Sequence, residues 1–373
     1  MDEAGACRRD QYFNSLYGHK DLLINMSGGD SQQLQPMPSP AASAAVTQEL
    51  CVSQHQRFEQ ADETTVTRIM LREEYRMEAA LMEFSNEKYY GNQLFLSQQV
   101  INGRHNGKIL GDLMTANPVH YQSADPNNPD QVVLQIINNN DLLLNVTNGF
   151  SIEDSQKSSV NMAEVLLCVD LAMSFLRSGV KETDLMILAS YTAQVYAIQN
   201  QLRRIEPQCK VRVMTVDGAQ GDEAHIVILS MARSVTQHGR PQEAGFVTDY
   251  RRLNVCLTRA RYCRYVVCDA EFFQKCAPTS DITAFIDFMK TRDKVRDVIV
   301  PYAPPAPVRQ FPPDEPQTTA APDAGLNEVP TPAPAPAPAP APVDPVDNID
   351  TTAAFASQRS IMQYFGANDF NDE

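Results

Sequence analysis

The 373-residue sequence predicts an α/β fold in which a parallel β-sheet is covered by helices on both faces. Two observations lead to this prediction. Between residues 62 and 298, short apolar segments of strand length alternate with amphipathic segments of helix length, and 43% of all residues are hydrophobic, which suffices for a large core. Strands that alternate with helices run parallel because each connection crosses over the sheet.

The expected elements follow one another closely along this region. They are a helix over residues 160–178, a strand over 184–189 (DLMILA), a helix over 191–205, strands over 210–216, 225–230 (HIVILS) and 265–269 (YVVCD), and a helix that ends near residue 289. Residues 95–150 allow two interpretations, an ordered insertion or a long mobile loop. Their asparagine-rich stretches favour partial disorder.

The composition changes after residue 298. Residues 299–354 are dominated by proline and alanine, so we expect them to form a disordered, partly polyproline II linker. Residues 355–373 regain aromatic side chains, which is typical of a short docking peptide. The sequence therefore divides into a segment 1–60, a domain 62–298, this linker and a C-terminal tail.

Charge and cysteine usage limit the classes of function. The net charge is −15, but ten acidic residues lie after residue 298, and a protein that grips one strand needs only a local basic groove. The eight cysteines show no CxxC and no zinc-type spacing, which is typical of a reducing intracellular compartment. No stretch approaches about 18 consecutive apolar residues, so we expect no membrane partner.

Two long motifs lie in order near the end of the expected domain. The first is TVDGAQGDE over 215–223, which precedes a buried strand, and the second is RRLNVCLTRAR over 251–261. Together they closely resemble motifs V and VI of superfamily 1 helicases, in the group of the nonsense-mediated-decay and Okazaki-fragment-processing helicases. This resemblance implies a RecA-like fold and a motor that uses ATP.

The resemblance also assigns roles to single residues. Arg259 becomes an arginine finger, Glu223 contacts the ribose, and Gln220 and Gly221 help to couple the nucleotide to the strand. A planar, permanently charged guanidinium suits the first role, since NTP hydrolysis builds negative charge on the transferred phosphoryl group. The other motif arginines can equally be solvated helix charges; these are Arg251, Arg252 and Arg261.

Upstream, the segments REEYRM over 72–77 and KYYGNQL over 88–94 resemble motif IV of the same group. The resemblance makes Arg76 a second phosphate-sensing arginine and Tyr75 an aromatic residue on the nucleotide side. Glu74 stands where the motif usually has Gln, which puts that contact in doubt.

A further segment, ILASYTAQ over 187–194, resembles a Thr-Pro-Tyr-x-x-Gln motif that touches the nucleic-acid backbone. Its first two motif positions differ, but Tyr191 and Gln194 match. With Thr215 from the first motif, they are the residues expected to contact single-stranded DNA or RNA. Tyr191 can also be an ordinary core tyrosine.

The start of the chain resembles part of a first motor domain. GDSQQLQP over 29–36 resembles motif III, where Gln33 would sense the γ-phosphate. Asp2 and Glu3 resemble the end of motif II, where the Asp holds Mg²⁺ and the Glu orients the attacking water, so ATP and Mg²⁺ are the implied cofactors. The phosphate-binding pattern GxxxxGK[ST] does not occur. We therefore expect segment 1–60 to be a remnant of a first RecA-like domain, and the chain to be inactive alone.

The tail contains QRSIMQYF, which resembles the peptide that binds sliding clamps such as proliferating cell nuclear antigen. In that peptide one helical turn gathers the apolar residues on one face, and the Gln fills a side pocket. The matching positions are Gln358, Ile361, Tyr364 and Phe365. An unused amphipathic tail is the other interpretation, because acidic residues follow where basic ones would favour an acidic clamp.

Three functional interpretations stay open at this point. The leading one is the C-terminal motor domain of an ATP-dependent DNA or RNA helicase, which supplies arginine fingers and strand contacts. The alternative is a catalytically inactive nucleic-acid- or clamp-binding adaptor that lost the phosphate-binding loop. An incomplete gene model would also explain the missing loop. The clamp-like tail favours the nucleus over the cytoplasm.

Overall fold

The computed structural model describes residues 6–7, 11, 26–36, 51–62, 64, 66–102, 107–154, 157–237, 239 and 242–301. Asp2, Glu3, the proline-rich linker and the clamp-like tail lie outside the described residues, so the predictions for them stay predictions. Among the residues that the structure does describe, no helix is both long and apolar enough to cross a membrane.

Six parallel strands form the central sheet, in the order β12-β5-β11-β10-β8-β9. Their bounds are β5 (Asp141–Val146), β8 (Leu185–Ala189), β9 (Arg212–Thr215), β10 (Ala224–Ser230), β11 (Ala260–Cys268) and β12 (Val295–Val298). The inner strands are almost continuously buried, as expected for a sheet covered on both faces. The predicted fold class is confirmed.

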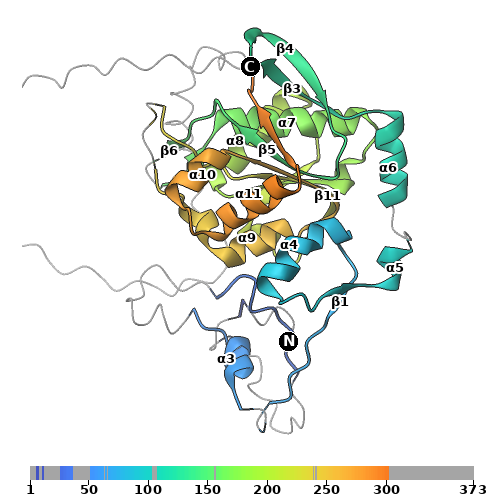
Figure 1. Ribbon diagram of the computed structural model, residues 1–373, viewed down its shortest axis with the longest axis vertical. Helices are drawn as coiled ribbons and strands as arrows, with labels where there is room; N and C mark the ends of the chain where they lie inside the picture. The colour runs from blue at the N-terminus through green and yellow to red at the C-terminus, as the bar shows by residue number, and fades with distance from the viewer. Residues whose placement is uncertain are drawn as a thin grey trace, which may run out of the picture. The chain divides into compact units, whose positions relative to one another are not determined.

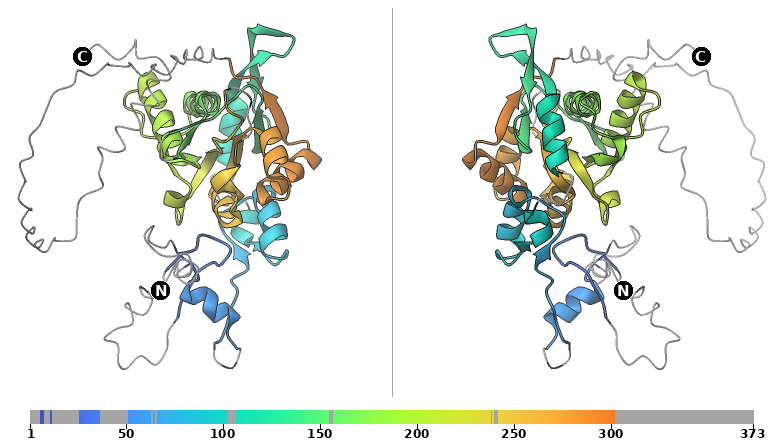
Figure 2. Two further views of the ribbon diagram at one scale, coloured as in Figure 1. Left: turned by 90° about the vertical axis from the view of Figure 1, so that its left-hand side faces the viewer. Right: turned by 90° about the vertical axis from the view of Figure 1, so that its right-hand side faces the viewer.

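Helices cover both faces of this sheet (Figure 2). On one side lie α7 (Met162–Arg177) and α8 (Thr192–Ile205). On the other side lie α4 (Ala79–Tyr89), α9 (Tyr250–Leu257), α10 (Ala270–Cys276) and α11 (Asp281–Thr291). Short polar side chains fix where several of them begin, because each accepts a hydrogen bond from the first helical turn; these N-caps are Asn161, Asp249 and Asp269.

The sequence placed most of these elements correctly, with three kinds of error, the first being that the single helix expected to end near residue 289 is the two helices α10 and α11. It anticipated α7, α8, β8, β9 and β10 to within two residues, but it began the last expected strand at residue 265, whereas β11 begins at Ala260. It missed β5 and β12 altogether. The asparagine run at 138–140 suggested a loop, although the apolar DLLLNV directly after it forms a nearly fully buried strand of the central sheet.

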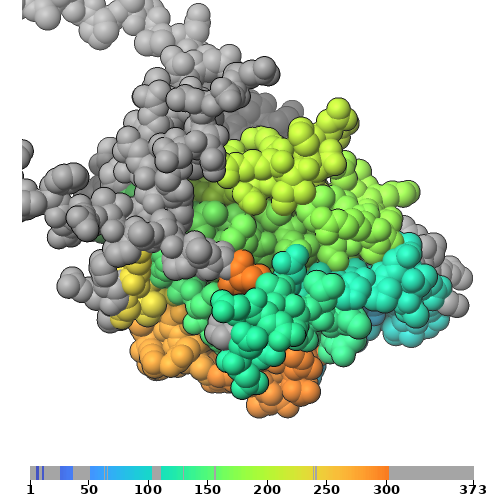
Figure 3. Space-filling model, turned by 90° about the horizontal axis from the view of Figure 1, so that it is seen from above, coloured from blue at the N-terminus to red at the C-terminus, as the bar shows by residue number. Residues whose placement is uncertain are grey.

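Residues 95–102 and 107–140 form an ordered insertion and residues 141–146 belong to the central sheet, so the interpretation as a mobile loop is wrong for the described part. The insertion contains β2 (Phe95–Leu96), α5 (Gln98–Ile101), α6 (Gly107–Ala116), and an antiparallel hairpin of β3 (His120–Asp125) and β4 (Asn128–Ile136). The hairpin projects from one end of the domain in Figure 1 and lies at the surface in the view of Figure 3. β2 pairs in parallel with β1 (Glu73–Glu74).

The remaining described elements are short. They are α3 (Gln54–Gln60) in the N-terminal segment, the antiparallel pair of β6 (Ile152–Glu153) and β7 (Ser159–Val160), and the 3-10 turns η1 (Glu182–Asp184), η2 (Asp217–Ala219) and η3 (Gly245–Thr248). Within the described part of segment 1–60, α3 is capped by the Ser53 hydroxyl, which accepts from the Gln56 amide at 3.0 Å.

A buried ion pair lies at the centre of the sheet. Arg264 of β11 binds Asp141 of β5 in a bidentate manner, with Nε to Oδ1 at 2.9 Å and Nη2 to Oδ2 at 3.0 Å, and neither side chain is exposed. Arg264 Nη1 also donates to the carbonyls of Leu81 at 3.0 Å and Leu257 at 2.9 Å. The pair therefore fastens α4 and the end of α9 to the sheet.

Substitution of Asp141 by Asn should lower the free energy of unfolding by about 3–5 kcal/mol, because Arg264 would be left as an incompletely balanced buried charge. Urea unfolding followed by circular dichroism measures this difference. The matched control is Glu271→Gln, which removes an exposed partner of Lys275 and should leave stability unchanged. Equal stability of Asp141→Asn and the wild type would contradict the assignment.

Candidate functional site

The residues of the two long motifs meet at the amino ends of β10 and β11. These strands are neighbours, with Ala224 opposite Ala260, so the residues directly before them, Glu223 and Arg259, lie side by side. Arg76 reaches the same place from the segment before α4, and its side chain binds both Glu223 and the carbonyl of Thr258, the latter at 3.2 Å. Segments far apart in the sequence thus build one basic site.

Glu223 is shared between two guanidinium groups. One carboxylate oxygen binds Arg76 Nε and the other binds Arg261 Nη2 at 2.5 Å. Burial by itself would raise the pKa of this carboxyl, but the hydrogen bond and charge of Arg76, with the charges of Arg261 and Arg259, outweigh it, so the pKa is lowered. Arg261 is therefore part of the site and not a solvated helix charge.

Arg259 is held almost completely inside the protein, with 1% of its surface exposed. Its Nε donates to the Val255 carbonyl at 2.9 Å, and Nη1 donates to the Asp222 carbonyl at 3.3 Å. Nη2 donates to the Thr258 hydroxyl at 3.0 Å and to Oε1 of Gln33 at 3.4 Å. The guanidinium is thus fixed in direction, with one edge toward the N-terminal segment.

The loop that carries Gln33 is organised by one carboxylate. Asp30 Oδ1 accepts from the Gln32 amide at 2.9 Å, and Oδ2 accepts from Gln33 Nε2 at 2.9 Å and from the Tyr90 hydroxyl at 2.6 Å. Burial and the Asp30 charge both raise the pKa of Tyr90, so its hydroxyl stays protonated as a donor. The Gln33 amide is oriented by these bonds, with its nitrogen on Asp30 and its oxygen on Arg259.

Helix α9 holds the same loop from the other side. Arg251 Nε donates to the Ser31 carbonyl at 3.1 Å, and Asn254 Nδ2 donates to the Gln32 carbonyl at 3.0 Å and to the Tyr90 hydroxyl at 2.9 Å. The sequence contained Tyr90 and Asn254 inside recognised motifs but gave them no role. The signal that could have found Asn254 is a polar residue between the apolar residues of a helix, whereas Tyr90, which directly follows α4, carries no such signal.

The other nucleotide-side residues lie around this centre. Tyr75 is 52% exposed beside Arg76. Glu74, at the usual Gln position, accepts from the amides of Arg76 at 2.7 Å and Met77 at 3.2 Å, so its carboxylate shapes the turn before α4. Gln220 and Gly221 follow a short 3-10 turn, and Gly221 has a φ of +83°, a conformation that side chains disfavour.

The residues expected to touch nucleic acid lie near the opposite edge of the sheet. Tyr191 follows β8, and Thr215 ends the adjacent β9, where it pairs with Ala189. Gln194 is fully buried: it accepts from the Asn161 amide at 2.9 Å and donates to Asn161 O at 3.2 Å and Ser230 Oγ at 2.8 Å. In this arrangement Gln194 has no surface for a strand, so any effect on strand binding would act through the loops that it joins.

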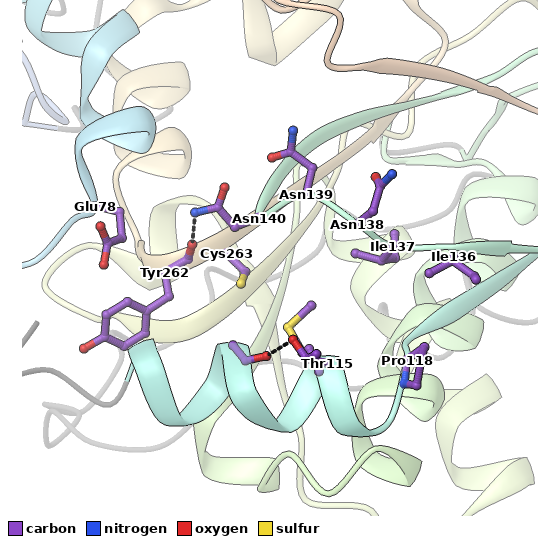
Figure 4. Close-up of a pocket in the computed structure, with 12 residues that line it drawn as sticks. Glu78, Thr115, Pro118, Ile136, Ile137, Asn138, Asn139, Asn140, Tyr262 and Cys263 are labelled. Carbon is purple, nitrogen blue, oxygen red and sulfur yellow. Dashed lines mark hydrogen bonds between the residues drawn. The ribbon is translucent and has the colours of Figure 1, made fainter.

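A separate pocket lies between α6, the β4–β5 connection and the start of β11 (Figure 4). Its lining includes the asparagine run 138–140, and Asn140 Nδ2 donates to the carbonyl of Tyr262 at 3.1 Å. None of the three arginines of the basic site lines it, and neither does Tyr191. Within the described residues, no group of three or more His, Cys, Asp or Glu side chains is placed to hold a metal ion.

The six-stranded parallel sheet with helices on both faces defines an α/β domain with a cluster of arginines at one edge of the sheet. The profile of a family described as an AAA domain matches residues 51–271, more than half of the chain. The chain belongs to this family and is homologous to superfamily 1 helicases.

Several curated proteins are similar to this chain. DNA-binding protein SMUBP-2 of Rattus norvegicus is 30% identical over 248 residues, which cover 65% of this chain and 22% of the relative. The human DNA replication ATP-dependent helicase/nuclease DNA2 is 31% identical over 273 residues, covering 70% and 24%. The Regulator of nonsense transcripts 1 homolog of Arabidopsis thaliana is 31% identical over 241 residues, covering 63% and 17%. The chain thus spans less than a quarter of each relative.

The pKa of Glu223 makes a prediction about acid stability. A carboxyl whose pKa is lowered by folding stabilises the protein above its ordinary pKa of 4.5, and this stabilisation is lost as the pH falls through the folded value. The wild type should therefore be more stable than Glu223→Gln at neutral pH, and the difference should shrink below about pH 4.5. Thermal unfolding across this pH range checks it, with Glu87→Gln on α4 as the control. A difference that grows on acidification would contradict the ion-pair geometry.

Proposed function

We propose that this chain acts as the second motor domain of a superfamily 1 helicase and presents Arg76 and Arg259 to the γ-phosphate of ATP. The observation that carries the proposal is the contact between Arg259 and Gln33. It joins the expected finger to the expected phosphate sensor at one point, and Asp30 fixes the direction of the Gln33 amide.

The residues present fit a nucleoside triphosphate. Two guanidinium groups, Arg76 and Arg261, share the single carboxylate of Glu223, so this cluster keeps a net positive charge. Such a surplus suits a group whose negative charge grows during phosphoryl transfer, and a buried, oriented arginine needs little rearrangement to stabilise it. When bound, ATP with Mg²⁺ would supply the phosphoryl group. The predicted Mg²⁺ ligand Asp2 lies outside the described residues.

In this proposal each residue has a limited task. Arg259 stabilises charge on the transferred group, Arg76 binds a phosphate oxygen after loosening from Glu223, and Gln33 reports the presence of the γ-phosphate. Tyr75 offers an exposed aromatic face on the nucleotide side. Tyr191 and Thr215 hold a strand of DNA or RNA at the other edge. The phosphate-binding loop would come from a first motor domain.

Loss of Arg259 should abolish motor activity without abolishing nucleotide affinity. We expect that this chain, expressed together with an in-frame upstream segment that contains GxxxxGK[ST], hydrolyses ATP when single-stranded DNA or RNA is added. Arg259→Ala should lower kcat by about a thousand-fold or more, because it removes the charge that meets the transferred phosphoryl group. The control is Arg292→Ala, an arginine paired with Glu83 far from the site.

Two results would oppose the motor-domain proposal. Undiminished kcat in a folded Arg259→Ala variant would remove the finger assignment. A transcript whose 5′ end encodes no phosphate-binding loop would favour the inactive adaptor. The purified chain alone is expected to show no strand-stimulated hydrolysis above its own Arg259→Ala variant, and robust turnover there would contradict the need for a partner domain.

We also propose that the tail binds a sliding clamp, which would place the protein in the nucleus. The support is the sequence match at Gln358, Ile361, Tyr364 and Phe365, which lie outside the described residues. The full chain should bind proliferating cell nuclear antigen in isothermal titration calorimetry. Tyr364→Ala with Phe365→Ala should remove that binding, because both aromatic anchors are lost. Binding that survives this double substitution would contradict the assignment, and Phe370→Ala is the matched control.

A further inference from the structure

The hydroxyl of Tyr191 accepts two hydrogen bonds and donates none within the described part of the structure. Tyr191 is half-buried between the end of β8 and the start of α8, and its oxygen accepts from Arg233 Nε at 2.8 Å and from the Phe246 amide at 3.3 Å. A phenol has one proton to donate besides its lone pairs. Among the contacts of the described residues, that proton is given to no acceptor.

These hydrogen bonds restrict the kind of ligand atom that the Tyr191 hydroxyl can bind. Because both lone pairs are engaged, the hydroxyl is no longer available to accept a hydrogen bond from a ligand. It is available only to donate one, so the ligand atom must be an acceptor such as a phosphate or carbonyl oxygen. Thr215 on the neighbouring strand also has a proton to donate, and one lone pair of its Oγ1 already accepts from the Gly218 amide at 3.2 Å.

Arg233 determines the direction of the Tyr191 hydroxyl. The residue is 6% exposed, its guanidinium carbon lies 4.8 Å from the centroid of the Tyr191 ring, and its side chain binds Glu153 and, at 3.2 Å, Gln242 Oε1. The chain reaches Arg233 from β10 through Ala232, which has a φ of +62° and whose amide donates to the buried Glu164 carboxyl at 2.8 Å. Nε and Nη1 of Arg233 are thus engaged, while Nη2 has no hydrogen-bond partner among the described residues, so the test must separate positioning by Arg233 from direct contact.

The turn before Phe246 completes this arrangement. Gly245 has a φ of +68°, and a Cβ there would overlap the Tyr191 hydroxyl. The absence of a side chain lets the backbone come close enough for the Phe246 amide to reach the phenol oxygen. The carboxylate of Glu153 would repel an anionic ligand nearby, but its pairing with Arg233 neutralises that charge.

We infer that Arg233 is a positioning residue that aims the Tyr191 hydroxyl at a phosphate oxygen of a bound single strand. The inference rests on the proposed strand-binding function and deepens it. The phosphate is favoured because two neutral donors, Tyr191 and Thr215, lie at the ends of adjacent parallel strands, and backbone oxygens recur at every nucleotide whatever the base. Arg233 therefore acts through the tyrosine and does not contact the strand.

The test measures binding of fluorescein-labelled oligothymidylate and oligouridylate to the full chain by fluorescence anisotropy over a range of salt concentrations. Tyr191→Phe keeps the ring and removes the donor, so affinity should fall by about three- to ten-fold. The slope of affinity against salt should stay unchanged, because a neutral donor releases no counterions. The matched control is Tyr196→Phe on the same helix, which should bind like the wild type.

Arg233→Met separates positioning from direct contact. It should cause the same loss as Tyr191→Phe with the same salt slope, and the double variant should lose no more than either single one. Additive losses, or a flatter salt slope in Arg233→Met, would show that Arg233 meets the strand itself and would overturn the inference. Arg233→Lys is measured beside it, so that a misfolded Arg233→Met does not end the test; it should recover part of the affinity.

The remaining outcomes distinguish failure of this inference from failure of the proposed strand-binding function on which it rests. If the wild type binds neither oligonucleotide, the strand-binding function fails and this inference fails with it. If the wild type binds but Tyr191→Phe binds equally well, only the inference is overturned. Equally tight binding of a thymine peptide nucleic acid, which lacks phosphates, would show that no phosphate oxygen is needed as the acceptor and would refute the phosphate assignment.

Discussion

The buried pair of Arg264 and Asp141 is the interaction on which the geometry of the basic site depends. It joins two neighbouring strands, and the spare donors of Arg264 bind the carbonyls of Leu81 and Leu257. Arg76 lies just before the helix that carries Leu81, and Arg259 follows two residues after Leu257. The fully buried guanidinium of Arg264 thus fixes the distance between the segments that carry Arg76 and Arg259. A buried charge of this kind is costly unless its donors are matched, and the described partners of Arg264 accept four hydrogen bonds from it.

A second constraint is the shortage of negative charge at the amino ends of β10 and β11. Glu223 must serve two arginines at once, and the charge of Arg259 also lowers its pKa. Like charges brought together in this way weaken folding unless a ligand compensates them. The site is therefore better suited to a bound polyphosphate than to the protein alone, which agrees with the proposed motor function.

Sequence reasoning predicted the parts of the molecule that are encoded locally. The segments that form β8 and β10 are continuous apolar runs with clear ends. The arginines of the site lie in short contiguous motifs, which can be recognised without knowing the fold. It could not find the pair of Arg264 and Asp141, because its partners are 123 residues apart and each looks like a surface charge when read alone. The first residues of β11 were missed for the same reason, because they include charged side chains. β5 was missed because the asparagines before it suggested a loop.

Gln194 shows the limit of transferring a role by residue type. The residue type is the one that the motif has at this position, yet the Gln194 amide is buried and bridges Asn161 and Ser230. The burial of Gln194 depends on contacts with residues such as Ser230, which belongs to β10 and is distant in the sequence. The polar groups near the carboxyl edge are thus divided between a few that can meet a ligand and a larger number that orient them.

Helix α9 connects the two edges of the sheet through adjacent arginines. Arg251 binds the loop of Gln33, while Arg252 binds Asp217 in the turn after β9, with Nε to Oδ1 at 3.0 Å, and lies 4.1 Å over the ring of Phe246. That ring packs on Tyr191. A short helix that is rigid along its axis cannot shift at one of these arginines without moving the other. Under the proposed function, a displacement of the Gln33 loop by a γ-phosphate would therefore also shift the residues at the surface that holds the strand.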